Sequence, residues 1–508
     1  MQDRKEELTE FVKTIKNKVH DWWVSFESRH LWTARLIVYF TCLAVVVSVC
    51  FSLFRYFNLF HTDADSARYM LSALVQSQAA IVAIVITLTL IAVQLSASAY
   101  SPRVIDSFKK NPDMWILLGC YGVSIFYGFI VLKLVEGAEG ETVSQSAIWA
   151  LGFVSISFEF CVSLAYWLGA FTFVALFAYM LNIIDLLKPP NIIKRLSEDI
   201  TKDKILSYIK FAKTKGVETR TVDDPAQPIV DIIRGSLMRY DLETTRDGLK
   251  GIAERAIKVI DSDEKGGEIS RHFCDHLQRV GRLAASRDDE EATAEVIEKL
   301  ENFGKSTAEK RVEDATSQAA RSLGVVGRAA TEKRLGVTLQ AVGSLKDIGS
   351  VAVKNELESA TSRIIDAFDG IGKTATEKKG LDDVVDHVAI SLGLLGEAAA
   401  EKGLDRATRK VALSLRLVAT KEIEMTIFNA SLYLGLIGKS AAKKGLEIAT
   451  LRAAKYLAEL TILSEETATQ VIRACEYEEL KDEDYEPFQK FIEKYKQELE
   501  IIRNQNHE

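Results

Sequence analysis

Four long apolar stretches in the N-terminal part of the chain constrain the fold more than any other feature. They run over 36–54, 69–102, 115–132 and 147–187. The segment 31–188 holds only 17 charged residues in 158, whereas 189–508 holds 106 in 320. Since an apolar helix of about 20 residues spans the hydrocarbon core of a bilayer, four such runs indicate membrane spans. The sequence predicts an all-α protein, with a four-span transmembrane domain followed by a large soluble helical domain.

The composition excludes several other classes of protein. Six cysteines in 508 residues are too few for a secreted disulfide scaffold. The net charge is −7 and comes almost entirely from the C-terminal part, which argues against a nucleic-acid partner. The first apolar run begins only past residue 30, so a cleaved signal peptide is disfavoured.

The distribution of lysine and arginine predicts the orientation of the spans. Basic residues concentrate before span one, between spans two and three, and after span four: Arg4, Lys5, Lys13, Lys16, Lys18, Arg29, Arg35, Arg103, Lys109, Lys110, Lys188, Lys194 and Arg195. The opposite loops hold only Arg55, Arg68 and Lys133. The positive-inside rule therefore predicts a multi-pass protein of the cell (plasma) membrane, with its N- and C-termini in the cytoplasm.

The boundaries of the expected parts follow from these shifts in composition. We expect a cytosolic amphipathic helix over 1–33, a transmembrane domain over 34–188, a linker with a short helix over 189–228, a cytosolic helical repeat domain over 229–475 and a charged helix over 476–508. Trp22, Trp23, Phe26 and Trp32 would place the first of these helices at the membrane interface.

The fourth apolar stretch is too long for one upright span. Its 41 residues would make a helix of roughly 60 Å. No polar loop interrupts Tyr166-Trp167-Leu168-Gly169, and two spans would move the soluble domain to the other side of the membrane. We therefore expect one long, tilted helix, with any bend at Gly169.

Span two carries a stripe of small and polar residues at helical spacing. The stripe consists of Gln76, Ala80, Ala83, Thr87, Leu90, Gln94 and Ser98. An amide in hydrocarbon is costly without a partner or water. Two interpretations remain open, namely close packing against other helices and the wall of a pore shared by several copies. In the second interpretation, Leu90 and Ile91 would form an apolar constriction between Thr87 and Gln94.

Glu159 is the other singular residue of the membrane part. An intramembrane carboxylate is a candidate functional group. It would lie near the middle of the bilayer if span four began at Ala147, and at the outer interface if the helix began nearer Phe160.

The soluble part contains an internal repeat. Pro189-Pro190 end the last span, and between Pro228 and Pro487 the sequence contains no proline. Apolar motifs ending in glycine or alanine recur at positions 304, 327, 349, 372, 396, 419 and 438, about 23 residues apart. Each unit reads as one helix and a tight turn, with glycine at helix ends such as Gly380, Gly403 and Gly445. This period predicts a HEAT-like α-solenoid, and a plain helical bundle is the alternative.

The C-terminal helix carries its own apolar seam, made of Phe488, Ile492, Tyr495, Leu499 and Ile502. This seam suits either a short coiled coil between subunits or packing against the chain's own solenoid.

Several motifs of the membrane part resemble a known family. The run from Ser77-Gln78-Ala79 to Gln94, the turn Ser101-Pro102-Arg103 and the following Phe108 are similar to a family of predicted prokaryotic membrane proteins of unknown function. The resemblance covers about 30–250 and includes Asp224-Pro225 and Val230-Asp231-Ile232-Ile233. It fades at Ser236–Asp241, where the family has a Ser-Pro and an Asn-Asp pair. The resemblance implies the membrane topology and no activity.

Sequence motifs for chemistry are weak. No phosphate-binding loop, dinucleotide fingerprint, His-Glu-x-x-His or Cys-x-x-Cys motif occurs. His272 and His276 share a helix face and could hold a metal, but the sequence around them offers no evident further ligand. We therefore expect no enzyme, no catalytic residue, no cofactor and no metal.

These features favour one function and leave an alternative. We expect a homo-oligomeric ion channel, in which span two lines the pore and the cytosolic helical domain regulates gating. Its partners would be membrane lipid, further copies of the chain, the permeant ions and an unknown cytosolic ligand or protein. The alternative is a membrane-anchored interaction scaffold without a pore. A secondary transporter fits worse, because the four spans show no inverted repeat.

Overall fold

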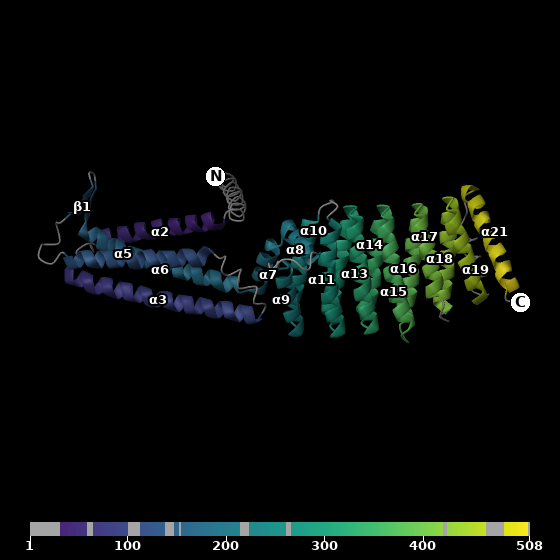
Figure 1. The fold of residues 1–508 in the computed structure, drawn as a ribbon, viewed down its shortest axis with the longest axis horizontal. Helices are drawn as coiled ribbons and strands as arrows, with labels where there is room; N and C mark the ends of the chain where they lie inside the picture. Colours follow the sequence, from purple (N-terminus) through teal and green to yellow (C-terminus); the bar gives the residue numbers. More distant parts are fainter. Residues whose placement is uncertain are drawn as a thin grey trace, which may run out of the picture. The chain divides into compact units, whose positions relative to one another are not determined.

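The computed structural model describes residues 31–57, 64–99, 112–137, 147–151, 154–213, 223–260, 266–419, 424–463 and 482–505. The chain divides into two compact units, 1–192 and 193–508, and Figure 1 shows their secondary structure. The expected N-terminal helix, up to residue 30, and the Ser101-Pro102-Arg103 turn lie outside the described residues.

The first unit is built from four long helices. These are α2 (Leu31–Tyr56), α3 (Ala64–Ala99), α5 (Pro112–Gly137) and α6 (Phe158–Leu186). Helix α6 contacts the other three, and α3 also packs on α5. All four are long and apolar enough to cross a membrane, so the prediction of four spans is confirmed.

The fourth apolar stretch is not one long helix, and this expectation was wrong. Its first part forms two antiparallel strands, β1 (Ala147–Leu151) and β2 (Val154–Ser157), and α6 begins only at Phe158. The physical reason is that Trp149, Val154 and Ile156 have side chains that favour extended structure. These residues are also as apolar as those of a membrane span, so hydropathy alone does not distinguish a strand from a helix here. At about 1.5 Å per residue, α6 is roughly 44 Å long, which suits one span.

Gly169 marks the close approach of two spans. It lies inside α6, and a Cβ atom there would stand 2.8 Å from Leu74 Cδ1 and 3.0 Å from Gln78 Nε2 of α3. A larger residue would require the ends of these two side chains to move, so the glycine allows close packing of α6 on α3 here.

The second unit consists of short helices in succession. They are α7 (Pro189–Asp199), which contains the unit boundary, α8 (Lys202–Lys213), α9 (Gln227–Met238), α10 (Leu242–Val259), α11 (Gly266–Ser286), α12 (Glu290–Glu309), α13 (Glu313–Glu332), α14 (Val337–Lys354), α15 (Glu358–Thr376), α16 (Asp382–Glu401), α17 (Asp405–Val418), α18 (Glu424–Lys443), α19 (Glu447–Leu463) and α21 (Asp482–Gln505).

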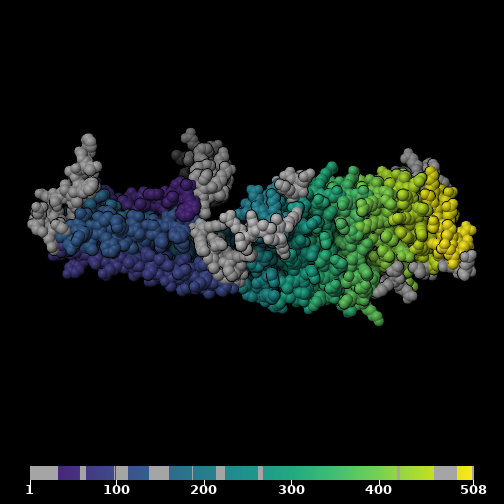
Figure 2. All heavy atoms as spheres, in the orientation of Figure 1, coloured from purple at the N-terminus to yellow at the C-terminus, as the bar shows by residue number. Residues whose placement is uncertain are grey.

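The contacts between these helices define a two-layer solenoid. Between α9 and α19, the extensive contacts join each helix to the next and to the next but one. The colours of Figure 2 accordingly run in sequence order from teal to yellow along this unit. A solenoid of this kind was predicted, and the pattern differs from that of a globular bundle, in which distant helices also meet.

The repeated glycines explain how successive units stack. A Cβ atom on Gly327 would stand 2.6 Å from Ile371 Cδ1, and one on Gly349 would stand 2.9 Å from Leu395 Cδ1. The same relationship joins Gly281 to Val326, Gly304 to Ile348, Gly372 to Val418 and Gly396 to Ile437. In each pair, an aliphatic side chain covers the glycine of the helix two positions earlier. This aliphatic residue directly precedes the glycine, or in the case of Val418 the alanine, that ends the next motif.

Several turns between the helices of the solenoid have the left-handed backbone conformation that was predicted from their glycines. Gly380, Gly403 and Gly445 have φ of 83°, 76° and 70°, which confirms the expected glycine turns. At five other turns the same conformation is taken by Tyr240, Asp288, Arg311, Arg334 and Glu356, which lack glycine's freedom.

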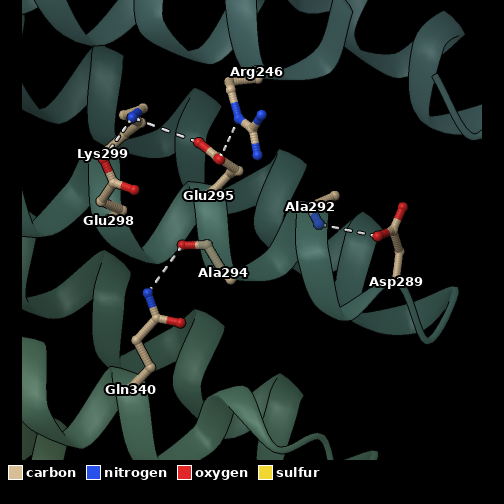
Figure 3. A network of polar contacts seen from close by, with 8 residues as sticks. All are labelled: Arg246, Asp289, Ala292, Ala294, Glu295, Glu298, Lys299 and Gln340. Atoms are coloured by element: carbon tan, nitrogen blue, oxygen red, sulfur yellow. Dashed lines mark hydrogen bonds and ion pairs between the residues drawn. The ribbon is translucent and has the colours of Figure 1, made fainter. Parts of the chain in front are cut away.

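Polar contacts connect alternate helices at the surface of the solenoid. Arg246 Nε of α10 lies 2.5 Å from Glu295 Oε1 of α12, and Gln340 Nε2 of α14 donates to Ala294 O at 3.5 Å (Figure 3). Arg246 is 55% exposed, so this pair contributes little to stability, and the apolar glycine contacts carry more of the stacking energy.

The C-terminal helix α21 packs on the solenoid of its own chain. It contacts α18 and α19. Ile492 and Tyr495 of the predicted seam are buried, as is Phe491, and the Tyr495 hydroxyl lies 3.1 Å from Thr461 Oγ1. The seam therefore packs against the chain's own solenoid, which was one of the two expected arrangements.

Candidate functional site

The predicted stripe on α3 lies on the outside of the first unit. All seven residues of the stripe are exposed: Gln76, Ala80, Ala83, Thr87, Leu90, Gln94 and Ser98. The buried residues of α3 are Ala67, Leu71, Val75, Gln78, Val85 and Thr89. Because consecutive helical residues are turned by about 100°, the two sets occupy opposite faces. Among the described residues, no helix of this unit covers the stripe.

The polar groups of the stripe differ in whether their own helix satisfies their hydrogen-bonding capacity. Thr87 Oγ1 donates to Ala83 O at 2.8 Å, and Ser98 Oγ donates to Leu95 O at 2.9 Å, so both hydroxyls are satisfied by their own helix. The amides of Gln76 and Gln94 are on the exposed face. Transfer of each amide from water to hydrocarbon without a hydrogen-bond partner would cost about 2–7 kcal/mol. Contact of these amides with water, or with a polar partner outside this unit, is therefore favoured over contact with lipid tails.

Two other polar residues of α3 face inward and are paired there. Gln78 Nε2 donates to Ser124 Oγ of α5 at 3.0 Å. Thr89 Oγ1 donates to Val85 O and lies 3.0 Å from the Tyr179 hydroxyl of α6. Close packing against other helices therefore explains Gln78 and Thr89, which lie on the buried face of α3 with Leu71 and Val75. It does not explain the stripe, which lies on the opposite face.

Glu159 lies in the first turn of α6 and is half-buried. Its helix begins at Phe158, so the carboxylate lies at the end of the span. A negative charge in the first turn interacts favourably with the helix dipole.

A charged cluster joins three spans at one end of the first unit, and sequence reasoning missed it. Asp113 in the first turn of α5 is 2% exposed. It accepts a hydrogen bond from Asn182 Nδ2 of α6 at 2.5 Å, and its Oδ1 lies 3.6 Å from Arg35 Nε of α2. An acid at the start of an apolar helix was the signal that could have found it.

A second cluster lies in the soluble unit and brings together three potential metal ligands. Asp224 precedes α9, whereas His272 and His276 lie one turn apart on α11. Asp224 Oδ1 is 3.0 Å from His272 Nε2, and Oδ2 is 2.9 Å from His276 Nε2. The ligand atoms of the three residues all lie within 4.8 Å of one another. The sequence had shown the two histidines, but their carboxylate partner is 48 residues away from His272.

The surroundings of this cluster hold its side chains in place. The backbone N–H of Ala226 donates to Asp224 Oδ1 at 2.9 Å, and the Tyr208 ring of α8 lies 5.4 Å from the His272 ring. Burial opposes ionisation of Asp224, but the hydrogen bonds from His272 and His276 outweigh it and hold the pKa of this carboxyl well below its usual range. The carboxylate therefore stays ionised.

Cys274 lies between the two histidines in sequence but is not part of the cluster. Its side chain is fully buried elsewhere on α11, and burial raises the pKa of its thiol. A buried neutral thiol is inert as a ligand or nucleophile.

The fold and these sites define a class: a membrane protein with four apolar spanning helices that carries a helical repeat domain. Residues 28–257 match the family model described as "Predicted membrane protein (DUF2254)", so the predicted resemblance to a family of membrane proteins is confirmed. The match includes all four spans and reaches α10.

Other comparisons add little. No curated protein matches the chain. A solved structure described as "Circular tandem repeat protein with novel repeat topology and enhanced subunit contact surfaces" is 14% identical, with 87% of this chain and 99% of that chain covered and a TM-score of 0.23. A TM-score of this size is too low to indicate a shared fold.

Proposed function

We propose that the protein is a homo-oligomeric ion channel of the cell membrane, with both termini in the cytoplasm. In this proposal the α3 helices of several copies turn their stripes toward a shared aqueous pathway. The observation that carries it is the position of the stripe, since Gln76 and Gln94 lie on the face of α3 opposite its buried residues. Copies arranged around an axis would give these amides water.

The spacing of the stripe supports contact between equivalent helices. Its members step by 4, 3, 4, 3, 4 and 4 residues, which approaches the heptad spacing of helices that pack along a seam. Leu90 is 57% exposed and lies between Thr87 and Gln94, so a ring of Leu90 side chains would be an apolar constriction that gates by dewetting. A solenoid changes shape through small movements between its repeats, and the repeat domain would regulate gating in this way.

Disulfide formation between copies tests the assembly. Leu90 and Leu88 are both exposed leucines of α3, at 57% and 46%, but they point to nearly opposite directions around the helix. In a background lacking the six native cysteines, Leu90→Cys should give cross-linked oligomers in native membranes, and Leu88→Cys should give none. Equal or absent cross-linking at the two positions would show that the stripe faces lipid, and the channel proposal would fail.

The alternative function is a membrane-anchored scaffold. The two-layer stack from α9 to α19 offers an extended surface, and solenoids of this architecture use such surfaces to bind partners. A scaffold needs no shared pathway, so it would keep its partner when Gln94 is replaced by leucine, whereas a channel would lose or alter its ion flux.

A further inference from the structure

We propose that Asp224, His272 and His276 form a binding site for a divalent transition-metal ion of the zinc class. The types of side chain in the cluster suit such an ion. Two imidazoles and one carboxylate are the protein ligands of many zinc and non-haem iron sites. Such a set leaves further coordination positions for water or another ligand. This proposal departs from the sequence-based expectation of no metal and does not depend on the proposed channel function.

The three side chains converge on a common point. Both Nε2 atoms turn toward the same carboxylate, at 3.0 Å for His272 and 2.9 Å for His276. Ligand atoms about 2.0–2.1 Å from a tetrahedral ion are roughly 3.3 Å apart. The two N···O distances would therefore need to lengthen by only a few tenths of an ångström, and every other pair of ligand atoms already lies within 4.8 Å.

The cluster is largely buried. Asp224 is 8% exposed and His276 is 3% exposed. A carboxyl group and two imidazole nitrogens therefore face one another in a site that is largely shielded from water, where a cation interacts strongly with a carboxylate. A divalent cation compensates the carboxylate and uses the imidazoles in their neutral form, which is the form that binds metals.

Neighbouring groups contact the proposed ligands. The Ala226 N–H fixes the Asp224 carboxylate, and the Tyr208 ring packs beside the His272 ring. Metal sites need such supporting contacts to orient their ligands. The ion would tie the segment before α9 to α11, next to α8, and would thereby fix the start of the repeat domain.

Titration of the full-length, untagged chain in detergent tests the proposal. After treatment with a chelator, Co²⁺ and Zn²⁺ are titrated separately, and Co²⁺ is followed by its visible absorption and Zn²⁺ by calorimetry. We expect one ion of either metal per chain, reversible by chelator. Absence of saturable binding by the wild-type chain would overturn the proposal.

Variants of the cluster decide whether these residues are the ligands. Asp224→Asn and His276→Gln should weaken binding by at least roughly 100-fold, since even changes to supporting residues cost 10–100-fold. The matched control is His387→Gln on α16, because this histidine is exposed and its Nδ1 contacts only the Asp383 carbonyl. Unchanged binding by both cluster variants would refute the assignment.

A third variant distinguishes the loss of a metal ligand from the loss of native structure. His272→Cys keeps a zinc ligand at the same position, so it should retain Co²⁺ and add a thiolate-to-cobalt charge-transfer band absent from the wild type. A purely structural hydrogen-bonded cluster would give no such band in a chain whose circular dichroism is native, and that result would also overturn the proposal.

Discussion

Gly324 of α13 lies directly against Ala367 of α15: a Cβ atom placed on Gly324 would stand 2.5 Å from the Ala367 Cβ and 3.0 Å from its Cα. The backbone of Ala367 cannot turn aside as a long side chain can. The two helices can therefore approach this closely only because position 324 has no side chain. Three residues later, the side chain of Ile371 lies over Gly327.

The first prediction follows from this contact. Gly324→Ala should lower the free energy of unfolding by about 1–3 kcal/mol, because overpacking moves the two helices apart. Gly343→Ala is the matched control, since no atom lies within 4 Å of a Cβ there and alanine favours a helix by about 0.5–1 kcal/mol. Urea unfolding of the full chain, followed by circular dichroism, should move the two midpoints in opposite directions. Equal shifts would contradict the packing argument.

Much of this architecture was predictable, because it depends on local spacing. The sparse charges over 31–188 indicated the membrane unit, and the glycines at 304, 327, 349, 372, 396 and 438 indicated one helix per unit. What those glycines contact could not be predicted, since Ile371 lies 44 residues beyond Gly327 and only the stacking of alternate helices brings them together.

The errors also have physical causes. The strands at 147–151 and 154–157 were missed because Trp149 and Ile156 are apolar whether they lie in a helix or in a strand. Asp224 was placed in a linker because Pro225 follows it, and nothing local relates it to His272. Asp113 was overlooked because one acid at the start of a span looks like an exposed residue until Arg35 and Asn182 are seen around it.

The second prediction concerns the Asp113 cluster. Asp113→Asn removes the charge that faces Arg35 and should destabilise the membrane unit by about 1–3 kcal/mol. Asp185→Asn is the control, because Asp185 is 62% exposed and pairs with Lys188, and such pairs contribute about 0–1 kcal/mol. Thermal unfolding of the full chain in detergent should separate the two variants, and similar melting curves would argue against a structural role for Asp113.

The third prediction concerns pH and Asp369 of α15. Burial raises the pKa of Asp369 to about 6, the hydrogen bond from Ser414 opposes this rise, and the charge of Asp366 adds to it while that of Lys410 opposes it. Because the folded-state pKa lies above that of the unfolded chain, ionisation of this group costs stability. Its contribution is most favourable below the unfolded pKa of about 4 and is lost as the pH rises through 6.

Replacing Asp369 with asparagine tests this sign. Asp369→Asn stays neutral at all pH values, so it should raise the free energy of unfolding by about 1–3 kcal/mol at pH of about 8. The gain should shrink as the pH falls toward about 4, where the wild-type group is also largely protonated. Urea midpoints of both chains across this range provide the measurement. A gain that does not depend on pH would show that the charge of Asp369 is not its cause.

The fourth prediction concerns the apolar constriction of the proposed channel. Leu90→Asn should increase ion flux through liposomes that contain the purified chain, because a polar side chain keeps a narrow apolar segment wet. Leu88→Asn introduces the same group on another exposed part of α3, where it would face lipid, so flux should stay at the wild-type level.

Gln94→Leu completes this prediction, since it removes an amide from the proposed pathway and should reduce flux. Its expected effect is opposite to that of Leu90→Asn, which a general loss of folding cannot produce, because unfolded protein lowers flux in both variants or leaks in both. Fluxes that respond equally to Leu90→Asn and Leu88→Asn would place the stripe in lipid and leave the scaffold as the function that remains.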